Sequence, residues 1–242
     1  MEAIILAGGL GTRLASRLNG IPKPMAPVAG RPFLEILLDR LREAGCARAI
    51  LSVGHLSSVI QDHFGEAFGG MRVSYVVENA PLGTGGAIRL ALGAATQNDV
   101  LVLNGDTYAA VSYGAMLELH RQSSADVTMA VSEQSDVARY GEVLLTPDPR
   151  MAAERVTGFR EKGRSGQGWI NAGVYVLGKS FPWPVELGER FSFETDVLMR
   201  DTHALRIAAF AAGPGFIDIG VPEDLDRAQL EFAPGRSSSS AD

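Results

Sequence analysis

The first thirty residues place the tightest constraint on how this chain folds. Residues 3–7 form a short apolar run of the kind that builds a buried strand. Glycines then occupy three of the next four positions, Gly8, Gly9 and Gly11. Glycines let backbone N–H groups approach an oxyanion, and Arg13 and Lys23 add full positive charges nearby. The stretch therefore predicts a phosphate-binding loop at the end of a first strand.

Two better-known phosphate motifs do not fit this stretch. A P-loop needs a lysine directly after its last glycine, and Lys23 lies far downstream. A dinucleotide fingerprint needs a third glycine where Leu14 stands, and the acids that follow, Glu35 and Asp39, fall in a helical pattern. A glycine-rich turn with a solvated Arg13 and Lys23 stays open as the alternative.

Composition limits the class of protein. With 242 residues, 46% of them hydrophobic, the chain can bury a substantial core. A net charge of −6 argues against general nucleic-acid binding. No apolar run reaches membrane-spanning length, and no secretory signal is predicted at the N-terminus. Cys46 is the only cysteine, so a disulfide within the chain is impossible, and a cytoplasmic location is predicted.

Hydrophobic periodicity predicts an α/β fold. Apolar runs alternate with helical patterns up to about residue 131, which predicts a mostly parallel, Rossmann-like sheet flanked by helices. The expected strands are 3–7, 49–53, 73–77, 100–103 and 127–131, and the expected helices are 32–44, 57–64, 82–95 and 113–120. The fully apolar run 100–103 is expected to lie centrally in the sheet.

After about residue 135 the pattern changes to strands without full helices between them. They are expected at 141–145, 155–159, 169–176, 205–210 and 215–219, with helices at 193–200 and 222–230. This half predicts a smaller mixed or antiparallel sheet beside the main one. We expect one domain over residues 1–232, made of two parts, 1–135 and 136–232. Residues 233–242 read as a low-complexity, flexible tail.

Two acids are candidates for holding Mg²⁺. Asp106 follows the fourth expected strand, and ligands gather beyond the carboxyl ends of such strands. One or two carboxylates, with phosphates and water, suit Mg²⁺. Asp218 stands between Ile217 and Ile219, where a buried lone charge is costly. It is a second metal ligand if it faces the site. A turn role for Asp106 and a solvent-facing Asp218 stay open.

Glu78 ends the third expected strand and is a candidate for reading the base. A carboxylate accepts from N1–H and the exocyclic amine of guanine together, which uracil and cytosine do not offer. The glycines of residues 82–86 are expected to pack against a flat base, with helix N-terminal amides free for ligand. A capping or solvated Glu78 is the alternative.

Polar residues of the second half suit a sugar phosphate. Lys162 can neutralise a phosphate, while Glu161 and Asn171 can bond hydroxyls. A charged hairpin turn and a strand bulge are the respective alternatives.

Taken together, these motifs resemble the signature of sugar-1-phosphate nucleotidyltransferases. The likeness covers nearly the whole chain except the tail, and it rests on motifs that recur in order, at residues 6–14, 22–24, 82–86, 104–106, 161–162, 171–173 and 218–220. Residues 24–34 and 159–163 most resemble the D-glycero-α-D-manno-heptose 1-phosphate guanylyltransferases of bacterial surface-polysaccharide synthesis. Gly163 and Val221 depart from the common family pattern, in which many relatives have Pro and Thr at these positions. Both departures affect the shape of a loop.

The resemblance implies a role for each motif. Nucleotide-binding roles are implied for Leu6, Gly8, Gly9, Gly11, Thr12, Arg13, Lys23, Glu78 and Gly83. Catalytic roles are implied for Arg13, Lys23 and Asp106, and Mg²⁺ ligation for Asp106 and Asp218. The implied sugar-phosphate pocket is Gly141, Glu161, Lys162 and Asn171.

The expected activity is transfer of GMP from GTP to a sugar 1-phosphate, which gives a GDP-sugar and pyrophosphate. A mannose 1-phosphate or UTP-using enzyme is the nearest alternative, and a non-catalytic sugar-nucleotide sensor or a dinucleotide-binding dehydrogenase is more remote. The partners are small molecules, with no nucleic acid or membrane, and a homo-oligomer is left open.

Overall fold

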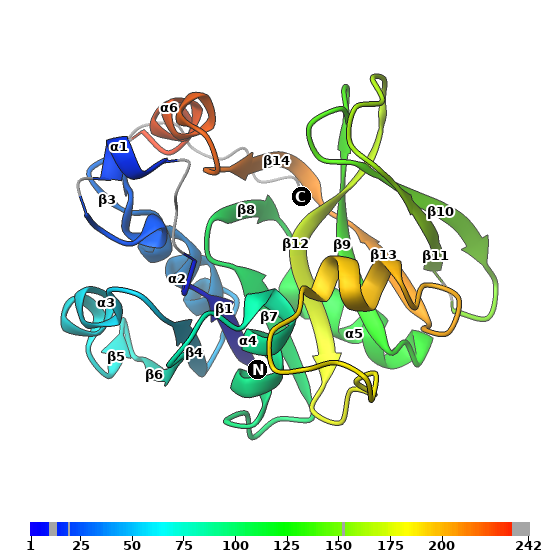
Figure 1. Ribbon diagram of the computed structural model, residues 1–242, viewed down its shortest axis with the longest axis horizontal. Helices are drawn as coiled ribbons and strands as arrows, with labels where there is room; N and C mark the ends of the chain where they lie inside the picture. The colour runs from blue at the N-terminus through cyan, green and yellow to red at the C-terminus, as the bar shows by residue number, and fades with distance from the viewer. Residues whose placement is uncertain (10–13, 19, 152, 234–242) are drawn as a thin grey trace.

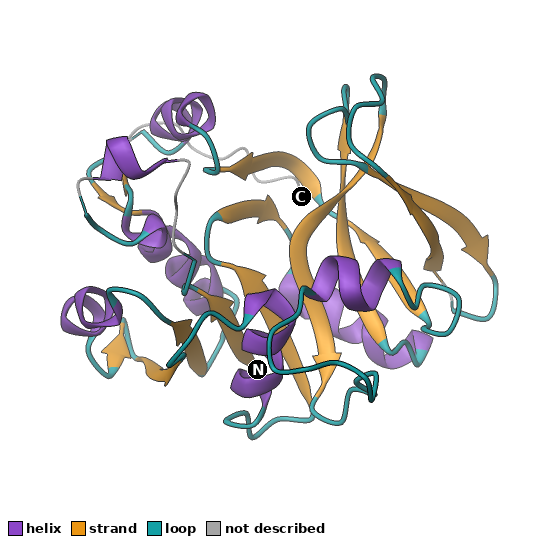
Figure 2. Ribbon diagram, in the orientation of Figure 1, coloured by secondary structure: helices purple, strands orange, loops and turns teal. Residues whose placement is uncertain are grey.

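The structure is a computed structural model that describes residues 1–9, 14–18, 20–151 and 153–233. A ten-stranded sheet runs through the molecule, with helices against both faces (Figures 1 and 2). In sheet order its strands are β10 (Glu142–Asp148), β11 (Ala153–Arg160), β13 (Ile207–Ala211), β9 (Val127–Gln134), β12 (Gly168–Gly178), β7 (Asp99–Asn104), β1 (Glu2–Leu6), β4 (Arg48–Val53), β6 (Met71–Val77) and β5 (Ala67–Phe68).

The first half of the chain confirms the parallel arrangement. β1 pairs in parallel with both β7 and β4, and β4 pairs in parallel with β6. β7 lies inside the sheet, as its uninterrupted apolar run predicts. The carboxyl ends of these strands therefore lie at one edge, where the glycine loop and Asp106 follow them.

The core has two parts because successive residues of a strand face opposite sides of the sheet. In β1, Ala3 and Ile5 join one buried cluster and Ile4 joins the other. Helices that bury residues in the first cluster are α2 (Phe33–Glu43), α3 (Ser57–Phe64), α5 (Tyr113–Ser123) and α6 (Pro222–Glu231). The second cluster is covered by α4 (Gly83–Leu92) and by η3 (Glu194–Met199), a π-helix within the helix expected at 193–200.

The sequence predicted a smaller mixed or antiparallel sheet for the second half of the chain, and the mixed, mostly antiparallel pairing is observed, but these strands do not form a separate sheet. Instead, β12 pairs antiparallel with β7, with Val174 opposite Leu103, and continues the same sheet. β7 has two hydrogen-bonding edges, and β1 occupies only one of them. A strand from the second half satisfies the other edge, so the two halves share one continuous backbone ladder.

Several short elements were not predicted from the sequence. One is β8 (Thr107–Ala110), which forms a small separate sheet with β14 (Gly213–Asp218), the strand expected at 215–219, and places Asp218 opposite Thr107. The others are α1 (Ala15–Leu18), the 3₁₀ helix η2 (Lys23–Met25), β2 (Pro27–Val28) and β3 (Arg31–Pro32). None of the helices in the described part of the chain is long and apolar enough to cross a membrane.

Glu2 is a buried acid that ties β1 to the segment before β7. Its carboxylate accepts from the backbone N–H groups of Thr96 and Gln97 at 2.7 and 2.8 Å, and from the guanidinium of Arg48 at 3.1 Å. Burial favours the neutral acid, but these donors outweigh it, so the pKa of Glu2 lies below its ordinary value of 4.5.

We expect Glu2→Gln to lower the free energy of unfolding at pH 7 by about 1.5–3 kcal/mol, because charge-assisted hydrogen bonds are lost. A group with a lowered folded-state pKa stabilises the fold above its unfolded pKa and ceases to do so as the pH falls through the folded value. The penalty should therefore shrink below about pH 4.5 in urea titrations. Glu118→Gln, on an exposed helix face, serves as control. An equal loss in the free energy of unfolding at pH 7 and below pH 4.5 would contradict a stabilising role for the ionised Glu2 carboxylate.

Candidate active site

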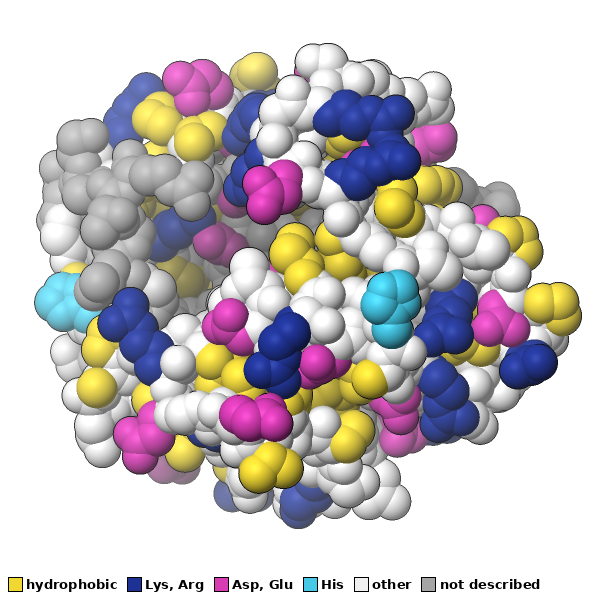
Figure 3. Space-filling view, turned by 45° about the vertical axis from the view of Figure 1, so that its right-hand side comes forward, with side chains coloured by type: hydrophobic (Ala, Val, Ile, Leu, Met, Phe, Trp, Pro, Cys, Tyr) yellow, Lys and Arg dark blue, Asp and Glu magenta, His cyan; other side chains and the backbone are white. Residues whose placement is uncertain are grey.

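A cavity of about 420 Å³ opens at the carboxyl ends of the parallel strands. In the space-filling view this face is hollowed, and basic and acidic side chains lie next to one another in the hollow (Figure 3). Its lining comes from several loops and from the start of α4, and the residues are Leu6, Gly8, Gly9, Lys23, Pro24, Glu78, Pro81, Gly83, Thr84, Ala87, Asn104, Asp106 and Arg190.

Lys23 and Asp106 line one end of this cavity, and Asp218, which is not part of the lining, lies against Lys23. Nζ of Lys23 lies 2.5 Å from Oδ2 of Asp106 and 3.9 Å from Oδ1 of Asp218. The lysine is 12% exposed, so its charge is only weakly screened. Burial and the neighbouring Asp106 raise the pKa of Asp218, while Lys23 acts in the opposite direction. One largely buried cation thus lies against two carboxylates, which are 35% and 32% exposed, and offsets part of their negative charge.

Local backbone contacts explain how these residues come together. Gly105 donates its N–H to the carbonyl of Leu6 at 2.9 Å, and a Cβ there would lie 2.5 Å from that oxygen. Only glycine permits this close approach between the ends of β7 and β1. Asp218 reaches the same place because β14 pairs with β8, which directly follows Asp106. Of the two possibilities for Asp218, the site-facing one is therefore the one observed.

This acid pair suits a divalent ion of the Mg²⁺ type. Asp106 and Asp218 both lie against the ammonium of Lys23, so a positive charge is already accommodated between them. Among the described residues no cluster of three or more His, Cys, Asp or Glu side chains forms a complete metal cage. Two carboxylates that leave the remaining positions to phosphates and water match the preference of Mg²⁺.

Glu78 lies at the other end of the cavity. Its Oε1 accepts from the hydroxyl of Ser52 at 3.2 Å, and its Oε2 accepts from the N–H of Leu82 at 3.2 Å. Each carboxylate oxygen retains a second lone pair for a ligand. The carboxylate is therefore held in a fixed orientation on the cavity wall, from which a ligand can reach it.

The glycines at the start of α4 have a different role from the expected one. A Cβ at Gly85 would lie 2.2 Å from the ring of Phe191, and one at Gly86 would lie 2.3 Å from the carbonyl oxygen of Glu189. The N–H of Gly85 donates to the carbonyl of Phe191 at 3.0 Å. A protein segment, not a flat base, therefore packs on Gly85 and Gly86, and it takes up helix N-terminal amides that were expected to be free. The backbone of Gly83 lines the cavity.

The residues expected to bind the sugar phosphate lie in a second group. Glu161 and Lys162 are exposed in the turn between β11 and β12, and a side chain at Gly141 would lie 2.8 Å from the carbonyl oxygen of Arg160, at the end of β11. Asn171 lies on β12, where the pairing with β9 is irregular between Asn171 and Tyr175, so the bulge named as the alternative for Asn171 is present. None of these four predicted residues lines the cavity.

A part-buried series of hydrogen bonds links Asn171 of this second group to the cavity. The amide of Asn171 donates to the hydroxyl of Tyr175 at 2.8 Å, and this hydroxyl donates to Glu194 at 3.4 Å. Glu194 also accepts from the hydroxyl of Thr84, which lines the cavity, at 2.5 Å. Burial and the charge of Glu194 raise the pKa of the fully buried Tyr175. These hydrogen bonds join α4, η3 and β12 between the second group and the cavity.

Sequence reasoning missed three polar residues of the cavity wall, Thr84, Asn104 and Arg190, and three apolar ones, Pro24, Pro81 and Ala87. Asn104 and Thr84 stand within motifs that were identified, but neither received a role. The side-chain Oδ1 of Asn104 is buried without a hydrogen-bond partner in the described part of the chain. Arg190 lies outside every motif, so no local signal could have found it. The predicted residues Gly11, Thr12 and Arg13 lie outside the described residues.

The sheet, its helices and the cavity at its edge define an α/β protein with the nucleotidyltransferase architecture. A family model described as nucleotidyl transferase matches residues 2–233. The chain is 41% identical to the D-glycero-alpha-D-manno-heptose 1-phosphate guanylyltransferase of Aneurinibacillus thermoaerophilus, over 96% of this chain and 98% of that protein. The chain therefore belongs to the nucleotidyl transferase family.

Two further comparisons agree with this assignment. The crystal structure of HddC from Yersinia pseudotuberculosis complexed with GMP-PN matches with a TM-score of 0.82 and 38% identity, over 96% of this chain and 99% of that one. The mannose-1-phosphate guanylyltransferase of Mycobacterium tuberculosis is 33% identical, and the match covers all of this chain and 67% of that protein.

The packing on α4 can be tested with Gly85→Ala. The added methyl group overlaps the ring of Phe191, so we expect a loss of about 1–3 kcal/mol in the free energy of unfolding. Gly114→Ala is the matched control, because a Cβ at this position in α5 meets nothing within 4 Å. That control should be neutral or more stable in urea titrations. Equal stability of the two variants would show that residues 189–191 do not pack on Gly85.

Proposed function

We propose that this protein transfers GMP from GTP to a sugar 1-phosphate and releases pyrophosphate. D-glycero-α-D-manno-heptose 1-phosphate is the proposed acceptor, and GDP-heptose is the product. The observation that carries the proposal is the Lys23–Asp106–Asp218 cluster at one end of a cavity whose other end holds Glu78. The relatives that carry the heptose guanylyltransferase name support the choice of acceptor.

In this proposal the nucleotide fills the cavity. Its phosphates lie by Gly8, Gly9 and Lys23, and its ribose lies by Leu6. Gly11, Thr12 and Arg13, which are outside the described residues, are proposed to bind the same nucleotide. The base lies by Gly83 and Glu78, and Glu78 accepts from N1–H and the 2-amino group of guanine. These two donors distinguish guanine from uracil and cytosine. The hydrogen bonds that hold the Glu78 carboxylate in a fixed orientation favour its pairing with both donors at once.

The acceptor binds on the side of the second group. Lys162 draws in its phosphate, and Glu161 and Asn171 bond its hydroxyls, with Gly141 against the same turn. The exposure of Glu161 and Lys162 leaves their charges available to a ligand. The chain from Asn171 through Tyr175 and Glu194 to Thr84 fixes the acceptor side relative to the nucleotide side.

The reaction is a direct displacement at phosphorus. An oxygen of the sugar phosphate attacks the α-phosphorus of GTP, and the bond from the α-phosphorus to the bridging oxygen breaks as pyrophosphate leaves. The nucleophile is already an anion, so no general base or covalent intermediate is required. The main barrier is repulsion between two anions, which Lys23 and Arg13 offset by placing positive charge beside the reacting phosphates.

Asp106 and Asp218 are proposed as the carboxylates that hold Mg²⁺. The ion supplies additional positive charge beside the phosphates. The same proposal includes a cytoplasmic location and a role in capsule or other surface-polysaccharide synthesis. Whether the protein forms a homo-oligomer is left open.

Replacement of Lys23 by Met should leave the fold intact and lower the turnover of GTP by roughly 10²-fold or more, because the central cation is lost. Pyrophosphate release measured with GTP and the sugar phosphate gives the rate. Arg121→Met, an exposed arginine paired with Asp99, should retain wild-type turnover. Turnover of the Lys23 variant within a few-fold of wild type excludes this role.

The substrate assignment can be tested with a panel of nucleotides and acceptors. Mass spectrometry of products from GTP with heptose and mannose 1-phosphates should give GDP-heptose as the preferred product. The 33% identical mannose-1-phosphate guanylyltransferase makes GDP-mannose the informative alternative. Glu78→Gln should lower the preference for GTP over UTP, since Gln cannot accept both guanine donors as a carboxylate does. Binding without any product would favour a sugar-nucleotide sensor instead.

A further inference from the structure

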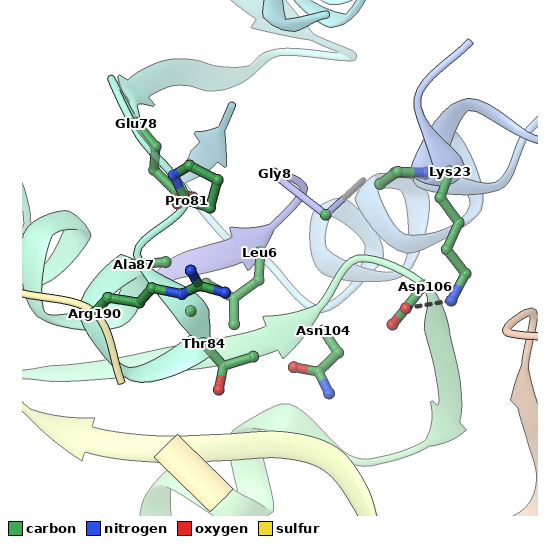
Figure 4. A pocket seen from close by; sticks show the side chains of 13 residues that line it. Leu6, Gly8, Lys23, Glu78, Pro81, Thr84, Ala87, Asn104, Asp106 and Arg190 are labelled. Atoms are coloured by element: carbon green, nitrogen blue, oxygen red, sulfur yellow. Dashed lines mark hydrogen bonds and ion pairs between the residues drawn. The ribbon is translucent and has the colours of Figure 1, made fainter. Parts of the chain in front are cut away.

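The cavity has two chemically different ends. Figure 4 shows Lys23 and Asp106 together at one end and Glu78, Pro81 and Arg190 at the other, with the side chain of Arg190 extending into the space between. On the proposed function, the phosphates of GTP lie at the Lys23 end, so its base lies between Glu78 and Arg190. Arg190 is the one arginine that lines this cavity among the described residues.

The backbone around Arg190 is held firmly. Phe191, the next residue, donates its N–H to the carbonyl of Leu82 at 3.0 Å and accepts from the N–H of Gly85 at 3.0 Å. The guanidinium of Arg89 lies 4.7 Å from the ring centroid of Phe191 and stacks on it. The loop on which Arg190 sits is therefore fixed to α4, which forms the same cavity wall.

The chemistry of guanine matches the two side chains at this end. Along one edge guanine presents the donors N1–H and 2-amino, and beside them the acceptors O6 and N7. A carboxylate pairs with the two donors, whereas the forked guanidinium of arginine pairs with O6 and N7. Glu78 and Arg190 together match this sequence of donors and acceptors. Adenine carries a donor in place of O6, which an arginine leaves unpaired.

We propose that Arg190 is a specificity-determining residue that donates to O6 and N7 of guanine while Glu78 binds the Watson–Crick edge. Glu78 accepts from a pair of donors that neither the pyrimidines nor adenine offer, since adenine has an acceptor at N1 and no 2-amino group. Arg190 adds a second selection against adenine, at the position of O6, and ties the base to the segment that packs on α4.

Two analogues of GTP separate the roles of these residues. 7-Deaza-GTP lacks the N7 acceptor, and ITP retains O6 and N7 but lacks the 2-amino group. We expect the wild type to have a kcat/KM for GTP roughly ten-fold above that for 7-deaza-GTP. Arg190→Met should bring this ratio close to one and leave the ratio of GTP to ITP unchanged. Glu78→Gln should lower the GTP to ITP ratio and leave the 7-deaza ratio unchanged. Arg121→Met, far from the cavity wall, should alter neither ratio.

Some results would overturn the proposal. If Arg190→Met lowers kcat/KM equally for GTP, 7-deaza-GTP and ITP, the arginine contacts a phosphate or only supports the loop. If Arg190→Met keeps the wild-type ratio of kcat/KM for GTP to that for 7-deaza-GTP, the contact of Arg190 with N7 is excluded as well. Equilibrium binding of GTP and 7-deaza-GTP to the full chain measures the same preference without turnover. Failure of the proposed function, seen as no product from any sugar phosphate, is thereby distinguished from failure of the Arg190 contact. Thermal unfolding of each variant confirms that it is folded.

Discussion

The contact of Lys23 with Asp106 and Asp218 is the interaction on which the rest of the site depends. Two carboxylates brought close together repel each other and resist burial, and the lysine between them removes much of this cost. The three residues come from distant parts of the chain, so their meeting requires the fold around them to be correct. η2, the β7–β8 connection and β14 each deliver one charge, and no one of these elements would form this cluster alone.

The fold supplies this cluster through a division of labour between the two halves of the chain. The parallel strands β7, β1, β4 and β6 present their carboxyl ends at one edge, as such sheets generally do. β12 then adds to the free edge of β7 and brings Asn171 and the β11–β12 turn alongside. The hydrogen bonds through Tyr175 and Glu194 fasten the two halves together, and Thr84 and Glu194, which are joined in this way, are 110 residues apart in the sequence.

Much of this architecture could be predicted from the sequence, because strands and helices leave local periodic patterns. The helix expected at residues 57–64 coincides with α3, and the apolar run at 100–103 lies inside the sheet as expected. Motif spacing also indicated Lys23, Asp106 and Asp218. The sequence left open whether the side chain of Asp218 faces the site or the solvent, because the alternation of residues along a strand does not show which other strand will pair with it.

What could not be predicted depends on contacts between residues far apart in the chain. The glycines of α4 indicated a close approach correctly, but not what approaches them. Gly85 and Gly86 face residues 189–191, about one hundred positions later, and nothing in either segment names the other. Arg190 was missed for the same reason, since its place in the cavity wall follows only from this packing.

The continuous ladder between β7 and β12 has a consequence for motion. Two lobes joined by a linker can rotate toward each other, but lobes that share backbone hydrogen bonds along five paired positions cannot do so without breaking them. The floor under both substrates is therefore rigid. Any enclosure of bound substrates must come from the loops on the rim, which can move while the sheet beneath them stays still.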